Sequence, residues 1–263
     1  MEIAGYIAAI FVGISLGLIG GGGSILTVPI MVYLFSVDEV LATSYSLFVV
    51  GSSSAIGALT QARKKLVDAK TVLIFGLPTL VTVFLIRKFL LPGLPSILWE
   101  NGSLVLTKNL AMLLLFSILM ILAAIAMIRS GKSNQEEDLV GDRNYFLILL
   151  SGVLIGSLTG LVGAGGGFLL IPALVFFAKL PMKMAVGTSL SIIAINSFFG
   201  FMGDLGNYDF DWLLLGSVTA LAVLGIFIGT KLSNYIPGKK LKPAFGWFVL
   251  LMGIYIIIKE LFL

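Results

Sequence analysis

The sequence predicts an all-α polytopic membrane protein made of two inverted repeats, each with a glycine-broken helical hairpin and three transmembrane helices. Three observations support this fold class. Of the 263 residues, 59% are hydrophobic and 11% are charged, whereas soluble domains carry roughly 25% charged residues. Uncharged runs such as residues 111–128 approach the length of a bilayer-spanning helix. The second half of the chain also repeats the first.

The internal repeat is visible when the sequence is aligned with itself at an offset of 143 residues. A Gly-rich motif followed by a proline then matches its copy without a gap. The matching residues begin with Gly17, Leu18, Gly20, Gly22, Gly23, Leu26 and Pro29, which fall on Gly160, Leu161, Gly163, Gly165, Gly166, Leu169 and Pro172. We therefore divide the chain into repeat 1 (residues 1–129), a polar linker (130–143) and repeat 2 (144–263). Internal repeats are typical of secondary transporters.

Repeat 1 is expected to begin with two short helices and to continue with three spans. Residues 5–20 and 24–36 predict helices of about 24 Å and about 20 Å, each shorter than the ~30 Å hydrocarbon core. A turn between them would therefore lie at depth. The three spans are predicted at residues 41–60, 70–90 and 108–129, and residues 91–107 are interpreted as an interfacial loop or short surface helix.

Repeat 2 is expected to have the same order of elements. Its glycine-broken stretch covers residues 160–173, and its three spans are predicted at 184–203, 211–230 and 243–258. Unwound backbone at membrane depth is tolerated only where it is buried in protein or lines a wet cavity. Both glycine turns are therefore expected inside the protein.

The lysines and arginines indicate how the chain crosses the membrane. If each glycine-broken stretch crossed once, the 17 basic residues would divide eight to nine. If the chain reverses at the glycines, thirteen lie on one side and four on the other. Because cytoplasmic loops carry an excess of Lys and Arg, the reversal is favoured. The linker is then cytoplasmic, whereas both termini and the loops at 36–40 and 204–211 lie outside.

The glycine turns and the hydroxyls that follow them form the candidate substrate site. A helix that begins at Ser24 or Gly167 has free N–H groups and the positive end of its dipole at the turn. Such ends bind anions without a cationic side chain. The candidate substrate-binding residues are Gly20, Gly21, Gly22, Gly23, Ser24, Tyr45, Ser46, Gly163, Gly165, Gly166, Gly167, Thr188, Ser189 and Asn196.

Each candidate has a structural alternative. The glycines can serve close helix packing or a tight turn, and the hydroxyls can bond their own helix backbone. Asn196 can make a hydrogen bond between two helices. The acids are expected in loops, termini and helix ends, with the repeat-equivalent Asp68 and Asp211 as cap or interface residues. No Arg or Lys is expected at depth, so dipoles and hydrogen bonds would attract the substrate.

The residues resemble the sulfite exporter TauE/SafE family of membrane transporters. The resemblance rests on G-L-I-G-G-G-G-S…P at 17–29, its copy G-L-V-G-A-G-G-G…P at 160–172, and A-x-G-T-S-L at 185–190. It covers nearly the whole chain and implies transport of small anions, notably sulfite and organosulfonates. The first half departs from this pattern, because it has A-T-S-Y-S-L at 42–47.

We therefore expect a multi-pass protein of the cell membrane that transports a small anion by alternating access around a central site at the paired glycine turns. A passive anion channel and an intramembrane enzyme are the alternatives. The chain has no His and no Cys, and we expect no catalytic residues, metal or cofactor. The expected partners are a small anionic substrate and the lipid bilayer, not nucleic acid. A coupling proton or cation and the oligomeric state are left open.

Overall fold

The computed structural model describes residues 2–101, 104–130, 145–162, 167–233, 235 and 238–262. Repeat 1 contains α1 (Glu2–Ile19), the 3-10 turn η1 (Gly21–Gly23), α2 (Ser24–Phe35), α3 (Glu39–Arg63), α4 (Ala69–Leu85), the π-helical turn η2 (Ile86–Leu90), α5 (Leu91–Gly93), β1 (Ile97–Asn101), β2 (Leu104–Thr107) and α6 (Lys108–Ser130). Repeat 2 contains α7 (Tyr145–Val162), α8 (Gly167–Phe176), α9 (Met182–Asp204), α10 (Trp212–Leu232) and α11 (Gly238–Phe262). Residues 131–143 of the predicted linker lie outside the described residues, as do Gly163, Gly165 and Gly166.

The described chain is mainly helical, as an all-α membrane protein requires. Within it, four helices are long and apolar enough to cross a membrane: Glu39–Arg63, Ala69–Gly93, Lys183–Asp204 and Trp212–Leu232. They match four of the predicted spans. The apolar segments of the other helices are 10–17 residues long in the described part of the chain. Large apolar side chains are exposed along the outer helices, for example Ile3, Phe146 and Leu213, which fits a surface in contact with lipid.

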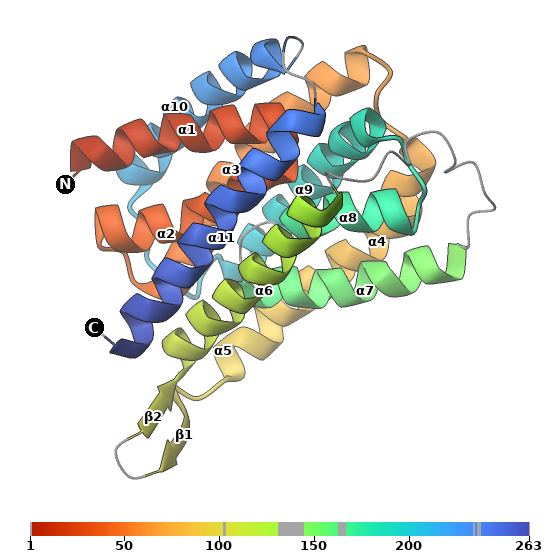
Figure 1. Ribbon diagram of the computed structural model, residues 1–263. Helices are drawn as coiled ribbons and strands as arrows, with labels where there is room; N and C mark the ends of the chain where they lie inside the picture. The colour runs from red at the N-terminus through yellow and green to blue at the C-terminus, as the bar shows by residue number, and fades with distance from the viewer. Residues whose placement is uncertain are drawn as a thin grey trace.

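The chain reverses direction at the first glycine turn. Gly23 at the start of α2 lies against Val12 and Leu16 of α1. At the other end of the pair, the ring of Phe35 lies over Gly5 and 5.2 Å from the ring of Tyr6. The two helices therefore form an antiparallel hairpin whose tip is the glycine turn (Figure 1).

The two halves pack through equivalent contacts. Gly13 of α1 lies against Ala222 of α10, and the residues 143 positions away, Gly156 of α7 and Thr79 of α4, are also in contact. Small residues at these positions let helix backbones approach closely. The contact of Gly57 with Leu190 likewise recurs as the contact of Gly200 with Leu47.

Helices α3 and α9 form the centre of the molecule. In each, 72% of the most apolar 18-residue window is buried, against 33% in the Ala69–Gly93 span and 39% in α10. The other helices surround this pair, with α6 packed on α11. Figure 1 places both termini on one side of the molecule and the start of α7 on the opposite side.

The interpretation of residues 91–107 as a loop or surface helix is wrong. The helix continues to Gly93, and β1 and β2 then pair as an antiparallel hairpin, with Glu100 opposite Val105. The helix ends at Gly93, and Leu94 is extended with φ −74° and ψ 133°, as expected for a residue that precedes a proline, here Pro95. Trp99 and the Leu-Val-Leu run at 104–106 supply side chains that favour strands.

Candidate functional site

The two glycine-broken stretches meet inside the molecule. Gly21 lies in backbone contact with Gly167, the first residue of α8, so a Cβ atom at either position would collide with the other glycine. Gly20 has φ 82° and ψ −121°, a backbone conformation that residues other than glycine rarely adopt. Gly22 lies within the same short turn. The N-terminal ends of α2 and α8 are thus brought together at one point.

Two of the candidate serines lie at this point. The Oγ atom of Ser189 on α9 is 3.2 Å from the position that a Cβ of Gly20 would take. Its hydroxyl donates to the carbonyl of Val186 at 2.8 Å, and the hydroxyl of Ser24 donates to the carbonyl of Gly21 at 2.7 Å. Each serine therefore bonds its own local backbone in this conformation, and its oxygen remains able to accept.

The hydroxyls of Tyr45 and Thr188 join the two repeats at the starts of two other helices, α10 and α4. The backbone N–H of Asp211 donates to Oη of Tyr45 at 2.6 Å, and the backbone N–H of Asp68 donates to Oγ1 of Thr188 at 3.0 Å. Tyr45 and Thr188 are repeat-equivalent, as are the two aspartates. The structure thus gives Tyr45 and Thr188 a role in holding the starts of α10 and α4.

Asp68 and Asp211 are N-caps, as the cap interpretation of the sequence expects. The Asp68 carboxylate accepts from the N–H of Thr71 at 2.8 Å. The Asp211 carboxylate accepts from the N–H groups of Leu213 and Leu214, both at 3.0 Å. Capping by aspartate satisfies backbone donors that the helix itself leaves free.

Asn196 makes a hydrogen bond between two helices. Its Nδ2 donates to Oγ1 of Thr79 on α4 at 2.8 Å, which is the structural alternative stated for this residue. Its Oδ1 is buried and has no partner among the described residues. The amide is therefore half satisfied, and one acceptor remains available.

A seam of buried hydroxyls is formed by side chains of α2, α3 and α9. Within the described part of the chain, the side-chain oxygens of these residues have no hydrogen-bond partner: Thr27, Ser46, Ser53, Ser54 and Ser197. Helices α3 and α9 pack closely along the seam, because a Cβ added at Gly51 would lie 3.0 Å from Cβ of Ser197. Unsatisfied buried hydroxyls are costly, so this seam is a second candidate for contact with a polar substrate.

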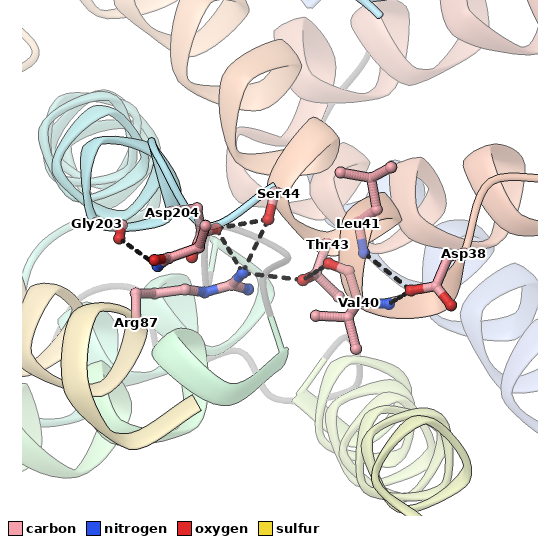
Figure 2. A network of polar contacts seen from close by, with 9 residues as sticks. Asp38, Val40, Leu41, Thr43, Ser44, Arg87, Gly203 and Asp204 are labelled. Atoms are coloured by element: carbon pink, nitrogen blue, oxygen red, sulfur yellow. Dashed lines mark hydrogen bonds and ion pairs between the residues drawn. The ribbon is translucent and has the colours of Figure 1, made fainter. Parts of the chain in front are cut away.

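A buried ion pair was missed by the sequence analysis. Arg87 and Asp204 are both fully buried, and Nη1 of Arg87 lies 2.8 Å from Oδ2 of Asp204. Nη1 also donates to Oγ1 of Thr43 at 2.9 Å, and the hydroxyl of Ser44 donates to Asp204 at 2.6 Å (Figure 2). The pair joins η2 to α3 and α9.

This ion pair corrects two expectations. Asp204 is the last residue of α9, not an exposed residue of the loop at 204–211, and Arg87 is a buried cation inside the protein. Arg87 lies in a π-helical turn, an irregularity that is frequent at functional sites. The signal in the sequence was a basic residue inside the apolar span at 70–90.

The ion pair occurs at one end of the molecule only. In the other repeat, the residues equivalent to Arg87 and Asp204 are Thr230 and Gln61. The residues equivalent to Thr43 and Ser44 are Val186 and Gly187. The two ends of the structure therefore differ in charge although their helices pack alike.

Aromatic side chains cover the same end of α3 and α9. The ring of Phe201 lies 5.0 Å from the rings of Phe48 and Phe210, and Phe210 lies 5.8 Å from Tyr45 and from Trp212. Such pairs stabilise beyond their buried area. The repeat-equivalent positions carry small residues: Thr188, Ser191, Ala58, Val67 and Ala69. One end of the central helix pair is thus filled with rings and the other is not.

Tyr208 lies in the loop beside the ion pair. Burial raises the pKa of its phenol above the ordinary value, and the negative charge of Asp204 raises it further. The phenol therefore stays protonated and able to donate a hydrogen bond. Among the described residues, no three His, Cys, Asp or Glu side chains are grouped as a metal site requires.

Comparisons with known proteins agree with a membrane transporter. The family model described as "Sulfite exporter TauE/SafE" matches residues 6–256. A "Probable membrane transporter protein" from Xylella fastidiosa is 30% identical over 256 residues, covering 94% of this chain and 91% of the relative. One from Methanocaldococcus jannaschii is 29% identical, covering 96% and 94%, and one from Bacillus subtilis is 25% identical, covering 93% of each. No solved structure gives a significant match.

Proposed function

Because this chain belongs to the sulfite exporter TauE/SafE family, we propose that it is a secondary transporter that carries a small sulfur oxyanion by alternating access. Membrane transport follows from the family and from relatives named as probable membrane transporters. The substrate and the mechanism are our proposal. The observation that carries it is the backbone contact between Gly21 and Gly167.

The proposed substrate site lies where the glycine turns meet. The N-terminal ends of α2 and α8 converge there, and the first N–H groups of a helix have no partner within the helix. Two converging helix dipoles favour an anion. Glycine allows the anion to approach the backbone, and Ser24 and Ser189 flank the turn with oxygens that can change partner. Gly163, Gly165 and Gly166, which lie outside the described residues, belong to the proposed site by their repeat equivalence to Gly20, Gly22 and Gly23.

The proposed substrate is sulfite, an organosulfonate or a related sulfur oxyanion. The family description supports this class. A tetrahedral or pyramidal oxyanion offers several acceptors to N–H and hydroxyl donors that lie on different helices. At the glycine turns the attraction would come from dipoles and hydrogen bonds. A site without a full opposing charge also releases its anion more readily.

The proposed mechanism is alternating access between the two repeats. Equivalent contacts, such as α1 on α10 and α7 on α4, support two similar halves that move about a shared centre. The difference between the two ends supports a conformation closed at the aromatic end. In the proposed orientation, both termini and the aromatic end face outward and the linker faces the cytoplasm, consistent with the bias of basic residues.

Transport by purified protein tests the proposal. We expect proteoliposomes loaded with unlabelled sulfite or taurine to accumulate the labelled compound by counterflow, because a carrier exchanges substrate through one occluded site. A passive channel would give no counterflow and would give a conductance in planar bilayers. Protein that is folded and inserted in the membrane but neither exchanges nor conducts sulfite or taurine would contradict the proposal.

A further inference from the structure

We propose that the outer edge of the Arg87 guanidinium, formed by Nε and Nη2, is a second oxyanion-binding site, separate from the glycine turns. The proposal rests on the proposed anion transport and specifies how the anion is recognised on its route. It starts from the way in which the hydrogen bonds of Arg87 are distributed over its three nitrogens.

All the observed contacts of Arg87 are made by one nitrogen. Nη1 lies near Thr43, Ser44 and Asp204, at 2.9, 3.5 and 2.8 Å. Nε and Nη2 are buried and have no hydrogen-bond partner within the described residues. Three of the five N–H donors of the guanidinium are thus left on one edge.

Burying the N–H donors of a charged group without hydrogen-bond partners is costly. The Nε and Nη2 edge of arginine is a planar fork that matches two oxygens of one carboxylate, sulfonate or phosphate group. Sulfite and organosulfonates have two such oxygens, one for each parallel N–H bond, whereas chloride must accept both N–H groups at a single atom and therefore with poorer alignment. The fork therefore recognises oxyanions as a class and discriminates against halides.

Asp204 contacts only the Nη1 side of Arg87, so the edge formed by Nε and Nη2 has no anionic partner among the described residues. The carboxylate binds Nη1 through Oδ2 only, and its Oδ1 has no partner in the described part of the structure. The ion pair is therefore one-armed, where arginine and aspartate frequently pair through two arms. Asp204 fixes the guanidinium from one side, while its own charge opposes an anion that approaches the other.

The position of the Arg87 guanidinium fits a binding site on the path of the substrate through the protein. Arg87 bridges η2 to α3 and α9, the two central helices, and α9 also carries Ser189 beside the glycine turn. Gly203, one residue before Asp204, lies beside Arg87, because a Cβ added at Gly203 would be 3.1 Å from Cβ of Arg87, so the side chain is held against α9. At the equivalent position of the other repeat the residue is Thr230. The proposed binding site is therefore present at one end of this path.

Titration calorimetry of sulfite, with chloride at equal ionic strength as the competitor, tests the proposal. We expect Arg87→Lys to weaken sulfite binding by about 10- to 100-fold, because lysine keeps the charge but loses the fork. Asp204→Asn should strengthen binding by about tenfold, because an opposing charge is removed. Lys88→Arg is the matched control, since Lys88 is exposed and the exchange of one basic residue for the other keeps the net charge, as Arg87→Lys does.

The double variant Arg87→Gln with Asp204→Asn separates binding from folding. It removes both charges together, so it should melt closer to wild type than either single neutral variant and should bind one sulfite fewer than wild type, because only the site at the glycine turns remains. A folded double variant that binds sulfite as wild type does would overturn the inference. Equal losses of affinity in Arg87→Lys and Asp204→Asn would assign the pair to the scaffold and would overturn it too.

The outcomes also distinguish this inference from the proposed function. Wild-type protein that binds and exchanges sulfite, with an Arg87→Lys variant that binds equally well, would overturn the Arg87 site alone. Wild-type protein that binds no oxyanion and shows no counterflow would overturn both. Displacement of sulfite by chloride at equal concentration would contradict recognition by a two-armed fork.

Discussion

Gly21 and Gly167 touch through their backbones, although they belong to different halves of the chain. A Cβ at Gly21 would collide with the backbone of Gly167, and a Cβ at Gly167 would lie 2.7 Å from the carbonyl oxygen of Gly21. Neither backbone can move without moving a helix start. The contact therefore fixes the relative position of α2 and α8.

The first prediction concerns this contact. Gly21→Ala or Gly167→Ala should destabilise the protein by about 1–3 kcal/mol, the range for overpacking, and should abolish anion binding at the glycine turns. Melting in detergent and calorimetry with sulfite would measure the two effects. Gly216→Ala is the control, because Gly216 has open space around it. Alanine variants that melt and bind as wild type does would show that the turns do not require glycine.

The second prediction concerns the two hydrogen bonds between the repeats. Tyr45→Phe leaves the N–H of Asp211 without its partner, and Thr188→Val does the same to the N–H of Asp68. Each should cost about 0.5–1.5 kcal/mol, the net contribution of a typical hydrogen bond, with transport lost only in proportion to the loss of folded protein. Thermal melting in detergent would check this, with Tyr235→Phe at an exposed site as the control. A loss of sulfite affinity without loss of stability would instead return these hydroxyls to the substrate site.

The third prediction concerns orientation. Because the chain has no cysteine, single cysteines report sidedness directly. Cysteines at Ile3 and Asn207 should react with an impermeant maleimide added outside intact cells, and cysteines at Ser133 and Lys183 only after permeabilisation. Labelling of Ile3 and Asn207 from opposite sides would contradict reversal at the glycines. Labelling of all four from the reverse sides would invert the proposed orientation.

Much of the fold was predictable from periodicity and composition. The spans at 41–60, 70–90, 184–203 and 211–230 correspond to the four long apolar helices, because length and hydropathy are local properties. The helix break at the first glycine turn was also predictable, since glycine runs stop helices. The strand pairing at 97–107 was not, because short apolar segments do not reveal which partner they will bond.

The site was predicted only in part, for a physical reason. Among the described candidates, those that lie together are Gly20, Gly21, Gly167, Ser24 and Ser189. Tyr45 and Thr188 instead bond the residues that precede α10 and α4, and these partners follow from helix packing, which the sequence does not reveal. Arg87 and Asp204 lie 117 positions apart in the sequence, on opposite sides of the linker. Each alone looks like a helix-end charge. Only the folded molecule shows that each is the buried partner of the other.

The last prediction concerns the aromatic end. Phe201 contacts Phe48, Phe210 and Trp212 and is 4% exposed, so it is a buried ring of the aromatic cluster at the end of α3 and α9 that also carries Ser44 and the ion pair. A cysteine at Ser44 should therefore be unreactive toward an impermeant thiol reagent added outside, and adding Phe201→Ala should make it reactive. The loss of one ring should cost about 3–5 kcal/mol, so melting must first show a folded variant. Saturating sulfite should alter the labelling rate, because a carrier changes access when its site is occupied. Equal labelling of Ser44→Cys with and without Phe201 would show that this end is open and that the aromatic side chains do not close it.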